Sequence, residues 1–134
     1  LVATSGDILT GFIQSSDELT LSALTGSIEE SGSDLEADLV GASALLSAST
    51  GIGALGGIET SLDSLTASLT GAGNLILSET DAITLTSLLT TDGLIDVTAG
   101  GSITAMSVIA GGLGQDLSLV ATSGDILVGT IFTK

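Results

Sequence analysis

Nine consecutive residues occur twice in this chain of 134 residues. The sequence LVATSGDIL fills positions 1–9 and returns at positions 119–127, an offset of 118. Internal repetition of this kind points to a repeat architecture. We therefore expect residues 1–118 to form one full solenoid repeat and residues 119–134 to begin the next, as one continuous piece of a longer repetitive protein. On this interpretation Val2–Ile8 and Val120–Ile126 lie on equivalent rungs.

Apolar residues alternate with polar ones in short bursts, which is the period of β-strands. The bursts also share a frame in which an aliphatic residue and an alanine precede a glycine-containing turn and an isoleucine. The clearest copies are LVATSGDI at 1–8, LSALTGSI at 21–28 and VTAGGSI at 97–103. The spacing predicts an all-β fold, a parallel β-solenoid with about 20 residues per coil and about six coils per repeat.

The residue usage fits the narrow interior of such a coil. The chain has two phenylalanines and no tryptophan or tyrosine, so aliphatic side chains must form the stacked inner ladders. It has no proline, which would remove a donor from a ladder, and 19 glycines, which can form tight corners.

Residues 35–70 fit the frame least well. Leu35, Leu39, Ala42 and Leu46 recur near helical spacing, so a pair of short amphipathic helices is one interpretation of this region. Several glycines interrupt the pattern, and glycine inside a helix costs about 1 kcal/mol relative to alanine. Insertions that lengthen a coil are the interpretation that we favour.

Several phrases resemble the repetitive regions of large bacterial surface proteins. They are VTAGGSITA, LSLVATSGDI and LILSETDAITLTSLLTTDG. The filamentous-haemagglutinin-like adhesins are the nearest named group, although their coils usually contain more asparagine and glycine. The resemblance covers essentially the whole chain and lies in the general character and period of the repeats rather than in a specific motif. It implies a right-handed parallel β-helix, export to the cell surface or medium, and a structural or adhesive role.

The charge of the chain excludes several classes of partner. Sixteen carboxylates accompany one basic residue, Lys134, for a formal net charge of −15. Nucleic acids and anionic membrane surfaces need lysine and arginine, so neither is expected as a partner. No apolar run approaches the roughly 18 residues of a membrane-spanning helix. The chain has no histidine, cysteine or tyrosine to act as acid, base or nucleophile. Carboxylate pairs alone can hydrolyse glycosides, but such sites also use aromatic and basic residues to hold the substrate, so we expect no enzyme activity.

Six carboxylates recur at about the coil spacing, mostly just before an apolar burst. Stacked coils would place them along one edge of the rod. Either this edge is simply solvated, which we favour, or calcium bridges it, since calcium binds six to eight carboxylate and carbonyl oxygens. The candidate ligands are Asp17, Asp38, Glu59, Glu79, Asp96 and Asp116.

A second possible calcium motif is GGLGQDLSL at 111–119, which nearly matches a calcium-binding nonapeptide. Such sites need tandem copies, and only one is present. We favour a glycine-rich corner that leads into a strand.

These observations predict a structural segment of a long extracellular or cell-surface filament without catalysis. The alternative is an adhesin stalk or binding module that contacts glycans or cells, stabilised in either case by calcium if that cation binds. Solenoid ends carry unpaired strand edges unless they are capped, so we also expect end-to-end or lateral association with like chains.

Overall fold

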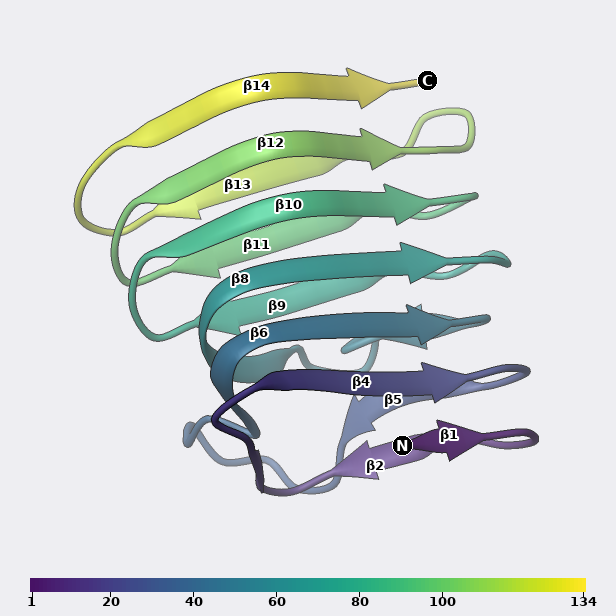
Figure 1. Ribbon diagram of the computed structural model, residues 1–134. Helices are drawn as coiled ribbons and strands as arrows, with labels where there is room; N and C mark the ends of the chain where they lie inside the picture. Colours follow the sequence, from purple (N-terminus) through teal and green to yellow (C-terminus); the bar gives the residue numbers. More distant parts are fainter.

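The computed structural model describes residues 1–134 and contains strands but no helix (Figure 1). Consequently no segment forms a helix long and apolar enough to cross a membrane. The strands are β1 (Val2–Ala3), β2 (Ile8–Thr10), β3 (Ile13–Gln14), β4 (Glu18–Ala23), β5 (Ser27–Glu30), β6 (Leu39–Ala48), β7 (Gly51–Ile52), β8 (Ile58–Leu69), β9 (Leu75–Glu79), β10 (Ile83–Thr90), β11 (Ile95–Ala99), β12 (Ile103–Ala110), β13 (Leu117–Ala121) and β14 (Ile126–Thr133).

The strands form two facing sheets, and every strand pair is parallel. The front sheet stacks β1, β4, β6, β8, β10, β12 and β14, and the back sheet stacks β2, β5, β7, β9, β11 and β13. In Figure 1 the chain runs along a front strand, returns along a back strand and climbs by one rung, which makes a right-handed coil. The prediction of a parallel β-solenoid is confirmed.

Two kinds of corner join the sheets. The first corner leads from a front strand to the next back strand, and the second corner leads from a back strand to the next front strand. Strand β8 itself wraps around a second corner, because its first residues pair with the end of β9 while the rest pair with β6 and β10. The coils are thus held together at the corners as well as on the flat faces.

Aliphatic side chains stack in register inside the coils. One inner column of the back sheet is Ile8–Ile28–Ile52–Leu75–Ile95–Leu117. A front-sheet column is Leu21–Leu46–Ala67–Leu88–Val108–Ile131. Each side chain loses contact with water by packing on the rungs above and below, so burial of apolar surface stabilises the stack. The core comprises 27 buried hydrophobic residues.

Residues 35–70 form strands rather than helices. The favoured interpretation is correct, because β6 and β8 occupy most of this region and the extra residues lengthen the coils at their corners. Val2 pairs with Ser22, a register of 20 residues, whereas Glu18 pairs with Ser43, a register of 25. The inserted residues include the segment 31–38, which lies at a second corner between β5 and β6.

The two copies of the nonapeptide do not lie on equivalent rungs, so that expectation was wrong. In the copy at 1–9 the turn leads from the front strand β1 to the back strand β2. In the copy at 119–127 it leads from the back strand β13 to the front strand β14. The copies are therefore half a coil out of phase. The physical reason is that the same residues can make either kind of corner: in both copies an alanine is joined to an isoleucine through a left-handed glycine. Gly6 has φ +80° and Gly124 has φ +86°.

The segment GGLGQDLSL forms a glycine-rich first corner between β12 and β13, as favoured. Gly112 and Gly114 have φ values of +91° and +73°, a region that glycine occupies without strain. The side-chain amide of Gln115 donates to Asp92 Oδ1 on the rung below at 3.0 Å. Hydrogen bonding between rungs thus holds this corner to the neighbouring coil.

Candidate functional site

Three carboxylates from successive parts of the chain meet at one second corner. Glu30 ends β5, Asp38 precedes β6, and Glu59 is the second residue of β8. One carboxylate oxygen from each lies within 4.8 Å of the other two. We call these three residues the acidic cluster.

The register of the coils explains why two of them meet. Leu39 is paired with Thr60, so the residues just before them, Asp38 and Glu59, stand one above the other. The Asp38 N–H donates to the Glu59 carbonyl oxygen at 2.8 Å, which holds the two backbones at ladder distance. Their side chains are consequently neighbours on one edge of the rod.

The inserted segment 31–38 brings the third carboxylate into place. Its Asp34 N–H donates to Glu30 Oε1 at 3.0 Å, and the Glu36 N–H donates to Asp34 Oδ1 at 2.9 Å. These bonds fold the segment over the corner. Asp34 thereby adds a fourth carboxylate beside the cluster.

Burial and like charge act together on the cluster. Asp38 is only 2% exposed, and its Oδ2 has no hydrogen-bond partner. Burial, followed by the charges of Glu30, Glu59 and Asp34, raises the pKa of Asp38 to about 6. Burial and the charge of Glu30 also raise the pKa of Glu59, whose Oε2 is likewise buried without a partner. Two negative charges at this separation repel by about 1 kcal/mol in water and by more in a partly buried site.

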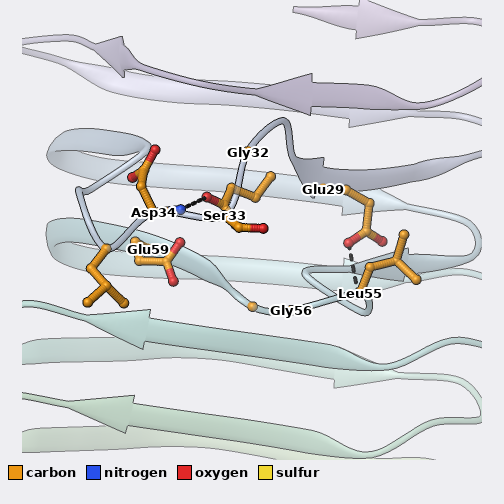
Figure 2. Close-up of a pocket in the computed structure, with 10 residues that line it drawn as sticks. Glu29, Gly32, Ser33, Asp34, Leu55, Gly56 and Glu59 are labelled. Atoms are coloured by element: carbon orange, nitrogen blue, oxygen red, sulfur yellow. Dashed lines mark hydrogen bonds between the residues drawn. The ribbon is translucent and has the colours of Figure 1, made fainter.

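A cavity of about 270 Å³ opens beside the cluster. Figure 2 shows the Asp34 and Glu59 side chains at one end of it. At the other end Glu29 Oε2 accepts a hydrogen bond of 3.1 Å from the Leu55 N–H (Figure 2). The lining is mainly polar: Glu29, Glu30, Gly32, Ser33, Asp34, Leu35, Leu55, Gly56, Gly57 and Glu59.

The six carboxylates singled out from the sequence do not form one stripe, so that expectation was wrong. Asp38 and Glu59 meet in the cluster. Asp17 lies exposed at the preceding second corner, whereas Asp96 lies near the start of β11 and Asp116 in the corner before β13, on the opposite side of the rod. The unequal coil lengths shift these residues out of line.

Glu79, another of the six carboxylates, is buried inside the coil and hydrogen-bonded to protein groups. It faces the interior at the end of β9 and is 3% exposed. Its Oε2 accepts from Thr60 Oγ1 at 2.7 Å and from the Leu62 N–H at 3.1 Å, and its Oε1 accepts from the Asp81 N–H at 3.1 Å. These protein donors provide the hydrogen bonds that the buried carboxylate needs.

Sequence reasoning missed Glu30 and Asp34 as members of the site. Glu29 and Glu30 are adjacent, and nothing in their spacing says which one turns toward Asp38. The sequence feature that could have identified them is the coil-lengthening insertion that follows Glu30. This inserted segment is acidic, and it folds back over a corner that already carries carboxylates.

Comparisons of this chain with protein-family models, with curated proteins and with solved structures find no match.

Proposed function

We propose that this chain is a structural segment of a long extracellular β-solenoid rod and has no catalytic role. The proposal is supported by the unbroken stacking of its rungs and by the lack of basic residues, which leaves trypsin-like proteases almost nothing to cut. A rod of this kind acts mechanically, as a stalk or a surface fibre.

The observation that carries the proposal is the continuity of the inner columns, which keep their register from rung to rung. Ile126, Val128 and Ile131 on β14 continue the inner columns of β12, whose corresponding residues are completely buried. The three residues on β14 are nevertheless 40–49% exposed. A further rung would bury them, and burial of apolar surface contributes about 25 cal/mol per Å².

The direction of the strands determines how such a rung could be supplied by another molecule. All strand pairs are parallel, so the free edge of β14 and the free edge of β1 can be paired head to tail with the same strand direction throughout. A head-to-tail contact of this type does not close on itself and generates a filament. Because each chain carries a net charge of −15, association requires salt to screen the repulsion.

Sedimentation velocity and negative-stain electron microscopy at about 0.15 M NaCl test the proposal. We expect particles of constant width whose length increases with protein concentration. Val128→Lys places a charge on the inner face of the last rung and should leave monomers. The control Thr130→Lys adds the same charge to the outer face of the same strand and should assemble normally. Monomers at every concentration, or equal behaviour of the two variants, would contradict the proposal.

A further inference from the structure

No basic side chain of this chain lies at the corner that carries the acidic cluster. Four carboxylates, those of Glu30, Asp34, Asp38 and Glu59, lie together at one corner. The only basic side chain of the protein is that of Lys134, four rungs farther along the front sheet, since β6 is followed by β8, β10, β12 and β14. No protein group therefore compensates the cluster.

A second observation points to a ligand rather than to a merely solvated acidic edge. Asp38 is 2% exposed, and its buried Oδ2 accepts no hydrogen bond; the buried Glu59 Oε2 accepts none either. Carboxylate oxygens in a protein interior ordinarily receive hydrogen bonds or bind a metal ion. The solvated-edge interpretation does not explain two buried oxygens without a donor.

The spacing of the oxygens allows all three to bind one calcium ion. Two ligands on one Ca²⁺ ion lie at most about 5 Å apart, because each Ca–O distance is 2.3–2.6 Å. Mg²⁺ demands near-ideal octahedral geometry and keeps most of its water ligands, whereas Ca²⁺ accepts an irregular set of carboxylates such as this one. The cluster oxygens lie within 4.8 Å of one another, so the corner accommodates calcium as it stands.

We propose that Glu30, Asp38 and Glu59 together bind one calcium ion. The cavity beside the cluster supplies room for water molecules, and Asp34 supplies a further carboxylate, so that the six to eight oxygens that calcium takes are within reach. The bound ion clamps the inserted segment 31–38 between the rung of β5 and the rung of β8. It therefore stabilises the most irregular corner of the rod.

Calcium titration of the metal-free protein by calorimetry, with thermal unfolding in EDTA and in calcium, tests this assignment. The wild-type protein should bind one calcium ion per chain and unfold several degrees higher with calcium than with EDTA. Asp38→Asn should weaken binding by at least tenfold. Because it also removes a buried charge, it should raise the melting temperature in EDTA, which a merely misfolded variant would not do.

The matched control is Asp63→Asn, which removes one exposed carboxylate from the same strand as Glu59 and should bind calcium as the wild type does. The assignment is overturned if calcium produces neither heat nor a melting shift. It is also overturned if Asp38→Asn and Asp63→Asn weaken binding equally, or if magnesium binds as tightly as calcium. These results are independent of filament assembly, so a failed calcium test leaves the proposed rod unaffected.

Discussion

The Glu79 carboxylate lies inside the solenoid and accepts a hydrogen bond of 2.7 Å from Thr60 Oγ1 on the rung below. Burial raises the pKa of Glu79, and the hydrogen bonds from Thr60, Asp81 and Leu62 act in the opposite direction. An ionisable group inside the coil is thus held by donors from two neighbouring rungs.

This pair predicts a pH-dependent effect of Thr60→Val. A carboxyl whose pKa is higher in the folded state destabilises the fold above that pKa and has no such effect below its unfolded pKa. Removing the Thr60 donor raises the folded pKa further and enlarges the penalty at neutral pH. We expect a loss of about 1.5–3 kcal/mol at pH 7.5 and about 1 kcal/mol at pH 4, measured by urea denaturation.

The control for this experiment is Thr90→Val. Thr90 is equally buried, but its Oγ1 donates to the Gly93 carbonyl oxygen, which does not titrate. Its loss of stability should be the same at both pH values. Equal losses at both pH values for Thr60→Val as well would mean that Glu79 does not depend on this hydrogen bond.

The inner ladder predicts a large effect of Leu85→Ala. Leu85 is completely buried and stands between Leu65 and Ala105, so truncation leaves a cavity that its neighbours cannot fill. We expect a loss of about 2–5 kcal/mol in the free energy of unfolding. The exposed neighbour Thr86 provides the control, since Thr86→Ala should change stability by less than about 0.5 kcal/mol. Similar losses for the two variants would contradict the inward orientation of Leu85.

The first corner predicts a strict requirement for glycine at position 93. A Cβ atom on Gly93 would overlap the carbonyl oxygen of Gly73, which lies directly on the preceding rung. We expect Gly93→Ala to destabilise the protein by about 1–3 kcal/mol, because one of the two backbones must move. Gly56→Ala, where the added Cβ meets open space, should be neutral or slightly stabilising. Thermal unfolding of both variants checks the contrast, which disappears if the corners of adjacent coils do not touch.

The sequence was sufficient to predict the solenoid because its frame reflects the packing of each rung. Ala23 and Ile28 face inward on either side of a corner, and Ala99 and Ile103 do so at the other kind of corner. The phase of the nonapeptide could not be predicted for the same reason. The frame consists of the residues that form a corner, and corners of both kinds use the same residues. The sequence therefore does not show which kind of corner a given copy forms.

The acidic cluster was predictable only in part. Asp38 and Glu59 were recognised from their recurrence at coil spacing, and their neighbouring registers brought them together. The contributions of Glu30 and Asp34 depend on how the segment 31–38 folds, and its conformation follows from hydrogen bonds within the segment rather than from a periodic pattern. Glu79 shared the spacing but not the environment, because its position at the end of β9 faces inward.

Spacing between rungs is the most direct test of the solenoid itself. The outward column of the front sheet runs Val2–Ser22–Ser47–Ser68–Leu89–Ile109–Phe132. Pulsed electron paramagnetic resonance can measure the distance from a nitroxide at Val2→Cys to one at Leu89→Cys, Ile109→Cys or Phe132→Cys. Stacked rungs predict about 19, 24 and 29 Å, a rise of about 4.8 Å for each added coil. Three distances that do not increase in equal steps of this size would contradict the stacked coil.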